Sequence, residues 1–247
     1  METSERVINP WPDAVVEMRE STASTMDDAR ALARTGCATG SVVCARFQER
    51  GRGRVPGRTW ISSPGESLLA TVVVLKRDIA FPPPELPLRA GVAAARAVED
   101  ASGASVLIKW PNDLVVGGRK LAGILCESSG DFLLVGIGIN LLQASFAAEI
   151  GSTACSLLQI SGQRVSASRM LSLVLVRLRE VLHDDGWRQR LREHLDAMGK
   201  RVRVDLLGSG SVVEGTIEGV DEKGRLMLRQ GDGTPVLIEQ GEIAPGP

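Results

Sequence analysis

Positive charge is concentrated in one glycine-rich stretch of the chain, QERGRGRVPGRTWISS at residues 48–63. Between positions 46 and 58 five arginines stand against a single glutamate, although the whole chain of 247 residues has a formal net charge of −1. Glycines let backbone N–H groups close around an anion, and guanidinium groups bind phosphate oxygens through two parallel hydrogen bonds. We therefore interpret this stretch as an anion-binding loop, with a nucleic-acid-binding tract and a solvated linker as the alternatives.

A second group of polar and charged side chains lies in IKWPNDLVVGGRKLAGI, residues 108–124. The pattern predicts a strand, a turn and another strand, with Asn112 and Asp113 at the bend and Lys120 after the next turn. Mg²⁺ accepts carboxylate oxygens such as those of Asp113 together with phosphate oxygens. Lys120 could neutralise a carboxylate or a phosphate as a mobile point charge. An ordinary Asn-Asp turn is the alternative.

The common nucleotide-binding motifs are missing from the sequence. GIGINL at residues 136–141 lacks the third glycine of a dinucleotide-binding fingerprint, and the residues after it do not resemble the start of a helix. GGRKLAG at residues 117–123 lacks the spacing and the Ser or Thr of a P-loop. A nucleotide, if bound, must be held by a different architecture.

Side chains suited to nucleophilic catalysis or zinc binding are scarce. The four cysteines form no CxxC pair, and Cys126 is expected to be a buried thiol within an apolar strand. The only histidines, His183 and His194, stand in a charged helical stretch and are expected at the surface. This leaves no Ser-His-Asp or Cys-His arrangement unless one of these histidines takes part. Any catalysis is therefore expected to depend on charged side chains and not on an activated side-chain nucleophile.

Apolar periodicity and turn residues predict the elements that must position these side chains. The predicted helices cover residues 25–34, 86–101 and 167–197, the last one broken near Gly186. The predicted strands cover residues 41–47, 67–75, 106–109, 114–116, 121–127 and 132–140. Strands that follow one another through short turns favour a mixed or antiparallel sheet covered by helices, an α/β (α+β) fold.

The composition changes near Gly199, where short alternating strands separated by glycine-rich turns begin. This is typical of a small five- or six-stranded β-barrel. The expected domains are 1–198 and 199–247. The longest apolar runs, at 68–75 and 132–142, are shorter than the roughly 20 residues of a membrane helix. The polar N-terminus has no signal-peptide pattern, so a cytoplasmic protein that does not enter membranes is expected.

The order of these stretches resembles the biotin protein ligases, also called biotin–[biotin carboxyl carrier protein] ligases. The similarity covers nearly the whole chain, and its motifs are STM (24–26), FQERGRGRVPGRTW (47–60), KWPNDL (109–114), RKLAGIL (119–125) and GIGIN (136–140). The resemblance implies a biotin/lipoate ligase fold, similar to class II aminoacyl-tRNA synthetases, with a C-terminal SH3-like barrel. Only 23 residues precede Ser24, so a short form without the family's N-terminal DNA-binding domain is expected.

The resemblance implies a reaction in two steps. Biotin and MgATP give biotinyl-5′-AMP and pyrophosphate, and biotin is then transferred to a lysine of a biotin carboxyl carrier domain. The implied biotin-binding residues are Ser24, Thr25, Met26, Gln48, Arg52, Gly53, Arg54, Lys120 and Gly123. The implied ATP- and adenylate-binding residues are Arg52, Trp60, Asn112, Lys120 and Asn140. The implied catalytic residues are Arg54, Lys120 and Asp113, with Asp113 either a Mg²⁺ ligand or a base.

This chemistry suits the residues present. A carboxylic acid with a pKa of about 4 is ionised at pH 7 and needs no general base to attack phosphorus. The obstacle is to bring that anion against a triphosphate, which arginines, a lysine and Mg²⁺ can do by positioning and charge neutralisation. A loop closed over the product would also keep water from the reactive adenylate.

Several alternatives stay open at this point. A lipoate-protein ligase or octanoyl transferase of the same fold is the nearest other enzyme. A nucleic-acid-binding module would need more net positive charge than this chain has, and no DNA binding is expected. The chain could act as a monomer or a homodimer, and the C-terminal barrel could cap the first domain or help to hold ATP or the carrier.

Overall fold

The larger of two β-sheets organises the first part of the chain. The computed structural model describes residues 6–55, 57–208 and 210–245. Seven strands follow the spatial order β1-β2-β3-β7-β6-β5-β4, with β1 and β2 parallel and every other pair antiparallel. Their bounds are Val16–Arg19 (β1), Val42–Ala45 (β2), Ser67–Leu75 (β3), Leu107–Lys109 (β4), Asp113–Val116 (β5), Arg119–Ser129 (β6) and Phe132–Asn140 (β7).

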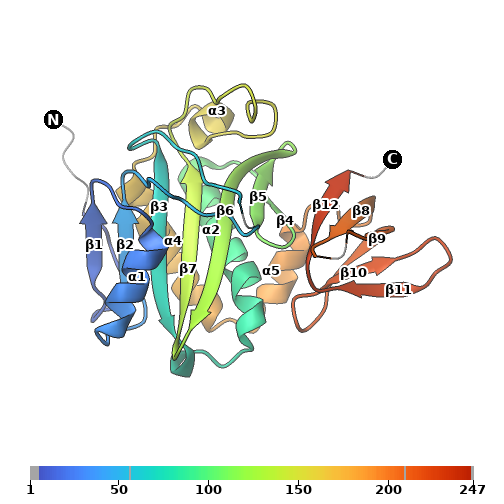
Figure 1. Ribbon diagram of the computed structural model, residues 1–247, viewed down its shortest axis with the longest axis horizontal. Coiled ribbons are helices and arrows are strands. Elements are labelled where there is room, and N and C mark those ends of the chain that lie inside the picture. The colour runs from blue at the N-terminus through green and yellow to red at the C-terminus, as the bar shows by residue number, and fades with distance from the viewer. Residues whose placement is uncertain (1–5, 56, 209, 246–247) are drawn as a thin grey trace.

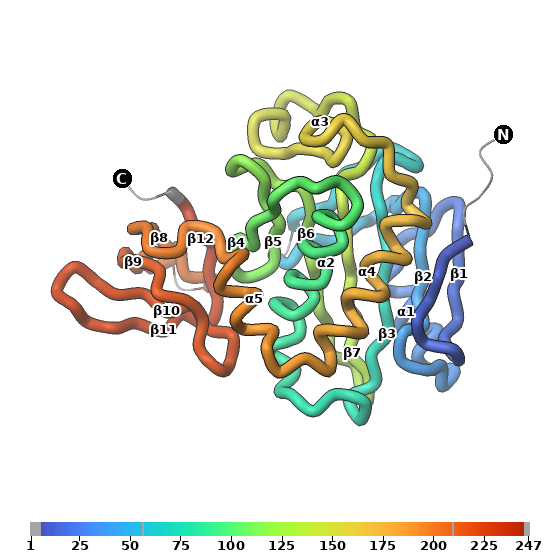
Figure 2. The backbone as a smooth tube through the Cα atoms, turned by 180° about the vertical axis from the view of Figure 1, so that it is seen from behind, coloured from blue at the N-terminus to red at the C-terminus, as the bar shows by residue number. Residues whose placement is uncertain are grey.

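Helices cover both faces of this sheet, which explains why its central strands are apolar throughout. The sequence SLLATVVVL of β3 is almost entirely buried, as expected for a strand packed on both sides. Helices α2 (Leu86–Ser102) and α4 (Ala167–Leu182) pack against each other on one face, as seen from behind in Figure 2. Helix α1 (Thr25–Arg34) packs against β2, β3 and β7 on the opposite face (Figure 1).

Helix α1 starts at the STM motif and is stabilised unusually at its first turn. Asp27 and Asp28 lie in that turn, where negatively charged carboxylates interact favourably with the positive end of the helix dipole. The Ser24 side chain makes no capping hydrogen bond. The backbone N–H of Thr25 donates instead to Oε1 of Gln48, at 2.8 Å. A residue of the glycine-rich loop therefore satisfies a free amide of the helix.

The C-terminal part forms a separate antiparallel sheet with the order β11-β10-β9-β8-β12. Its strands are Arg201–Leu206 (β8), Val212–Val220 (β9), Leu226–Arg229 (β10), Pro235–Ile238 (β11) and Gly241–Pro245 (β12). The expected small β-domain is thus present with five strands. Within the described residues no ladder joins the two edges β11 and β12, so the sheet curls without closing. Figure 1 shows it beside β4, β5 and the short helix α5 (Trp187–His194).

The predicted elements agree closely with those of the structure, with a few differences. Helix α1 and strand β7 have the predicted bounds, and the long helical region is interrupted between α4 and α5, close to Gly186. Strand β1 and the short helix α3 (Leu157–Ser161) were not predicted. His183 is exposed, but His194 is partly buried, with Nε2 3.2 Å from a carboxylate oxygen of Glu99.

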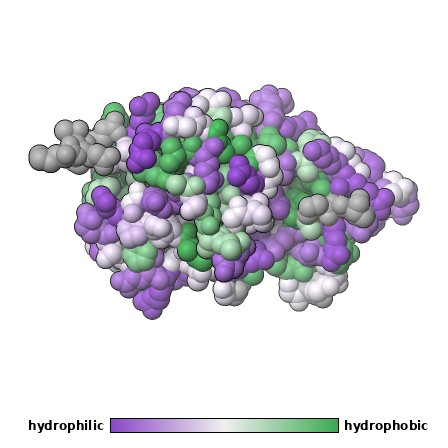
Figure 3. Space-filling view, turned by 90° about the horizontal axis from the view of Figure 1, so that it is seen from above, coloured by the Kyte–Doolittle hydropathy of each residue, from purple (hydrophilic) through white to green (hydrophobic). Residues whose placement is uncertain are grey.

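On the face seen from above, hydrophobic residues show in several groups between hydrophilic ones (Figure 3). Among the residues that the structure describes, no helix is long and apolar enough to span a membrane.

Candidate functional site

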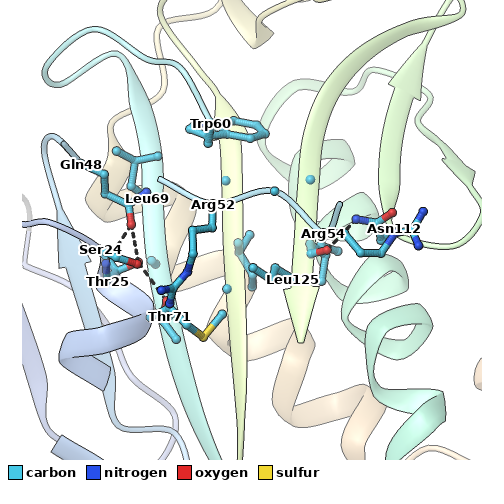
Figure 4. Close-up of a pocket in the computed structure, with 18 of the residues that line it drawn as sticks. Ser24, Thr25, Gln48, Arg52, Arg54, Trp60, Leu69, Thr71, Asn112 and Leu125 are labelled. Carbon is cyan, nitrogen blue, oxygen red and sulfur yellow. Dashed lines mark hydrogen bonds between the residues drawn. The ribbon is translucent and has the colours of Figure 1, made fainter. Parts of the chain in front are cut away.

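A cleft opens on the face of the large sheet that carries α1. Its empty volume is about 550 Å³, the open mouth included. The walls come from the start of α1, from the glycine-rich loop and from the central strands β3, β6 and β7 (Figure 4). Eleven of the predicted site residues line it: Ser24, Thr25, Met26, Gln48, Arg52, Gly53, Arg54, Trp60, Asn112, Lys120 and Gly123. Asp113 does not line it but contacts Lys120, which does. Motifs spread over a hundred positions therefore converge on one cavity.

A buried set of hydroxyl and amide groups forms one end of the cleft. The hydroxyl of Thr25 is 2.9 Å from Oε1 of Gln48 and 2.9 Å from the hydroxyl of Thr71. Both threonines are buried, and Figure 4 shows Gln48 pointing toward the start of α1. These groups fix one another in place, so they can present donors and acceptors to a polar ring at a defined position.

The glycine-rich loop forms a narrow hairpin across the cleft. Gly53 N–H donates to the carbonyl of Arg58 at 2.9 Å, and Trp60 N–H donates to the carbonyl of Gly51 at 3.0 Å. In Figure 1 the connection between β2 and β3 passes in front of the sheet. The hairpin places Arg52 and Arg54 on the wall of the cleft, as expected for a loop that binds anions.

The indole of Trp60 lies against strands that carry no side chain beneath it. A Cβ atom at Gly138 would be only 2.9 Å from the ring, and one at Gly123 would be 3.2 Å from it. Real Cβ atoms essentially never approach closer than 3.0 Å, so Gly138 is required for this ring position. The indole Nε1 is buried and has no hydrogen-bond partner among the described residues. It is left to donate to a bound molecule.

The two ends of the KWPNDL and RKLAGIL motifs meet at the cleft. Nζ of Lys120 is 2.7 Å from Oδ1 of Asp113, and it also lies 5.9 Å from the centre of the Trp60 ring. The Asn112 amide donates to the carbonyl of Ile124 at 2.8 Å. Asn112 therefore braces strand β6, while Lys120 stays 40% exposed and accessible to an anion.

Arg54 is the most enclosed cation of the loop. One of its terminal nitrogens donates to the carbonyl of Gly241 at 3.0 Å, and its Nε is buried without a partner among the described residues. Burial lowers the pKa of Arg54, and the charges of Glu242 and Asp113 oppose this effect. An arginine remains protonated in proteins, so a partly desolvated positive charge faces the cleft.

Arg52 is paired at the rim of the cleft. Its guanidinium donates to both carboxylate oxygens of Asp27, at 2.8 and 3.2 Å. Arg30 also contacts Asp27, and it forms a second ion pair with Glu127. Burial raises the pKa of Asp27, but the hydrogen bonds from Arg52 and Arg30 outweigh it, so the pKa is lowered overall. Asp27 is therefore an anionic anchor for the loop.

Asn140 does not line the cleft, and its predicted contact with the adenylate stays a prediction. Its side chain is buried, and its amide donates to the carbonyl of Cys155 at 3.0 Å. The bond joins the end of β7 to the segment before α3. The backbone of Lys120 is bonded to the same segment, since its backbone N–H donates to the carbonyl of Thr153 at 2.7 Å. Asn140 thus supports the wall beside Lys120.

Sequence reasoning missed several lining residues that lack reactive groups: Leu69, Ala70, Thr71, Ile124, Leu125, Gly136, Ile137 and Gly138. Alternation could have identified some of them, because residues two apart on a strand point to the same face. Which face of a fully apolar strand carries the cleft is visible only from the sheet's packing.

Neither a metal cage nor a reactive thiol is part of this arrangement. Within residues 6–55, 57–208 and 210–245, no group of three or more His, Cys, Asp and Glu side chains could hold a metal ion. Burial raises the pKa of the Cys126 thiol to about 12, and that of Cys44 to about 12 as well. Both thiols are therefore protonated near neutral pH and poor nucleophiles.

The chain is similar to known proteins over almost its entire length. The model of the biotin/lipoate A/B protein ligase family matches residues 18–143, and the model of the biotin protein ligase C-terminal domain matches residues 197–244. The biotin–[acetyl-CoA-carboxylase] ligase of Mycobacterium tuberculosis is 33% identical over 234 residues, which cover 90% of this chain and 85% of that protein.

Solved structures extend the likeness to the fold. The biotin protein ligase of Aquifex aeolicus in complex with biotin and ATP superposes with a TM-score of 0.81 at 28% identity, covering 93% of this chain and 97% of that one. The biotin protein ligase of Leishmania major in complex with biotinyl-5-AMP has a TM-score of 0.66 at 26% identity, covering 94% and 99%.

Proposed function

The chain belongs to the biotin/lipoate A/B protein ligase family, and from this premise we propose that it is an ATP-dependent biotin protein ligase. The enzyme activates biotin to biotinyl-5′-AMP and transfers it to a lysine of a biotin carboxyl carrier domain. Relatives from Mycobacterium tuberculosis and Paracoccus denitrificans are named biotin–[acetyl-CoA-carboxylase] ligases, and related structures hold biotin with ATP or biotinyl-5-AMP.

One observation supports this proposal above the others. The cleft combines a buried polar end, formed by Thr25, Gln48 and Thr71, with a cationic rim that includes Arg54 and Lys120. Biotin has a polar ureido ring at one end and a carboxylate at the other. A ring seated against Thr25 and Gln48 would direct its carboxylate toward the cations, where a phosphate must meet it.

The residues of the rim act on the first step by positioning and by charge. Lys120 exchanges its contact with Asp113 for the biotin carboxylate and the α-phosphate, because its side chain is partly exposed and a lysine ammonium sits on a flexible stem. Arg54 holds a desolvated positive charge beside the reacting groups, which stabilises the negative charge that accumulates as pyrophosphate departs. The indole of Trp60 packs against the adenylate base and retains it in the cleft.

The residues present are compatible with Mg²⁺ as an ATP-bound ion. Asp113 is a single carboxylate that does not itself line the cleft but contacts Lys120, which does. Mg²⁺ characteristically takes one or two carboxylates together with phosphates and waters, without a cage made only of protein groups. Asp113 would hold the ion, which supplies neutralisation of the phosphate charge when bound.

The second step needs a neutral amine on the carrier lysine. A cleft rimmed by arginines and Lys120 disfavours another ammonium ion, so docking lowers the pKa of the incoming lysine. Asp113 would accept the proton once Lys120 has moved to the ligand, and this base role competes with the metal role. We thus propose Asp113 as the proton acceptor of the transfer step, separately from its proposed role in adenylation.

The organisation of the chain follows the same proposal. Residues 1–198 form the catalytic domain and residues 199–247 the C-terminal domain. A cytoplasmic location is part of the proposal, because the reaction consumes ATP and acts on a carboxylase carrier. The absence of DNA binding and the monomeric or dimeric state stay predictions.

The decisive experiment is transfer of labelled biotin to a purified biotin carboxyl carrier domain, with ATP and without it. We expect label on the carrier only when ATP is present. A parallel reaction with lipoate and a lipoyl carrier domain is expected to give none. Lipoate transfer without biotin transfer would reject the proposal in favour of the lipoate ligase branch of the family.

A further inference from the structure

The C-terminal sheet touches the glycine-rich loop at strand β12. The guanidinium of Arg58 donates to both carboxylate oxygens of Glu242, at 2.5 and 2.8 Å. The neighbouring carbonyl, that of Gly241, accepts the hydrogen bond from Arg54. Two consecutive residues of β12 therefore hold two arginines of one loop, although they lie more than 180 positions away in the sequence.

Within the loop, Arg58 is coupled to residues that line the cleft. The carbonyl of Arg58 accepts from Gly53 N–H across the hairpin, and the backbone at Gly53 packs against Arg58 so closely that a Cβ would be 3.2 Å from it. Gly53 and Arg54 line the cleft, whereas Arg58 does not. Movement of Arg58 therefore displaces residues that contact the ligand.

The opposite side of the loop is anchored independently by the Arg52–Asp27 pair. The loop thus spans the cleft between two ion pairs, one on helix α1 and the other on the C-terminal sheet. An extended segment held at both sides stays over the cavity, while a segment held at one side can swing away from it.

Other contacts hold the C-terminal sheet itself. The indole N–H of Trp110 donates to the carbonyl of Gly224 at 3.0 Å, and Arg188 donates to the carbonyl of Glu222 at 3.1 Å. Both acceptors lie in the turn between β9 and β10. Loss of the Glu242 contact therefore leaves the sheet docked, and the hydrogen bond from Arg54 to the Gly241 carbonyl is then the loop's remaining described tie to β12.

We propose that Glu242 is a positioning residue, which acts through Arg58 to keep the glycine-rich loop closed over biotinyl-5′-AMP. The inference rests on the proposed function and gives the C-terminal domain a role in retaining the intermediate. The opposing view is that this partly exposed ion pair contributes nothing measurable, as many surface pairs do.

The test measures how fast bound biotinyl-5′-AMP leaves the enzyme. Wild type, Glu242→Gln, Arg58→Gln and the double variant are loaded with biotin and ATP, separated from free nucleotide, and followed by the adenylate that remains bound. Both single variants are expected to lose it about five- to tenfold faster, with biotinylation of a bystander protein rising in parallel. The double variant is expected to match the faster single variant, because one interaction is removed in each case.

Glu214→Gln provides the matched control, since it removes the Arg201–Glu214 ion pair of 3.1 Å from the same sheet. It is expected to release the adenylate at the wild-type rate. Thermal unfolding of each variant checks that the fold is kept, and Glu242→Asp, which retains the charge on a shorter side chain, is expected to restore part of the retention.

The outcomes separate this inference from the proposed function. No adenylate on the wild-type protein would overturn both. An adenylate that wild type and Glu242→Gln retain equally would overturn the inference alone. Additive effects of Glu242→Gln and Arg58→Gln would also overturn it, because they would show that the two residues act separately.

Discussion

The ammonium group of Lys120 is 2.7 Å from a carboxylate oxygen of Asp113, across neighbouring strands β6 and β5. The cation and the anion come from different motifs of the sequence, and Asp113 holds Lys120, which lines the cleft. In the proposed reaction both have a second partner, the substrate anions for Lys120 and Mg²⁺ or a proton for Asp113. Their pairing balances the charge of Lys120 until those partners arrive.

Replacement of Lys120 by Ala is expected to lower the rate of adenylate formation by about a hundredfold or more, because a charge that stabilises the transition state is lost. Biotin-dependent exchange of labelled pyrophosphate into ATP measures this step. Lys76→Ala, which removes an ammonium group bonded to the carbonyl of Gly130 far from the cleft, is the control. Near-normal exchange by Lys120→Ala would remove Lys120 from the catalytic assignment.

The variant Asp113→Asn separates the two roles proposed for this carboxylate. If Asp113 holds Mg²⁺, adenylation should require about tenfold more Mg²⁺, while transfer from added biotinyl-5′-AMP should stay near normal. If Asp113 is the base, transfer should fall and adenylation should survive. Mg²⁺ titrations of each half-reaction distinguish these results, and no change in either would exclude both roles.

The Asp27 carboxylate should stabilise the protein in a pH-dependent manner. Its pKa is lower in the folded protein than the ordinary value, so its stabilising effect is present above pH 4 and is lost as the pH falls through the folded-state pKa. About half of the side chain is exposed, which limits the effect to less than about 1 kcal/mol.

Urea unfolding at pH 7 and pH 2 measures that effect. Asp27→Asn should be less stable than wild type at pH 7 and equal to it at pH 2. Asp131→Asn, at an exposed position of the β6–β7 turn, should match wild type at both. A deficit of Asp27→Asn that persists unchanged at pH 2 would contradict the ion-pair explanation.

Cys126→Ser is expected to retain adenylation and transfer, because the thiol has a pKa of about 12 from burial and is not a nucleophile at neutral pH. Alkylation of Cys126 by iodoacetamide at pH 8 should be far slower than that of a fully exposed cysteine in a short peptide. Mass spectrometry of the Cys126 peptide measures it. Loss of transfer in a folded Cys126→Ser protein would instead favour a thioester mechanism of the octanoyl transferase kind.

Local patterns predicted much of this molecule from the sequence. Helix α1 and strand β7 were predicted to the residue because capping residues, turn glycines and apolar periodicity mark their ends clearly. Strand β1 was missed because four residues, Val16 to Arg19, give little periodicity. Its pairing with β2 is parallel and reaches over the whole of α1, so the partner that makes it a strand is not visible locally.

The site shows the same division. The residues of the cleft that bear charge or a hydrogen-bonding group were mostly identified from their motifs, because these motifs combine glycines with charged or amide side chains at short spacings. Thr71 was not identified, since a threonine within SLLATVVVL looks like any β-branched residue of a buried strand. The contact between Arg58 and Glu242 was equally hidden, because it depends on how two separately folded sheets meet.

The glycines beneath Trp60 also act as a size filter. Gly123 pairs with Gly138 across strands β6 and β7, so the part of the cleft floor beneath the indole is bare main chain. One added methyl group at Gly136 would meet the flexible end of Met26 at 2.8 Å, whereas one at Gly138 would meet the rigid indole at 2.9 Å. A substitution at Gly136 can therefore change the depth of the cavity gradually, because the Met26 side chain can shift. A substitution at Gly138 would instead prevent the Trp60 indole from lying over the cleft. The size of the molecules that the cleft can admit therefore depends on the absence of side chains at Gly136 and Gly138.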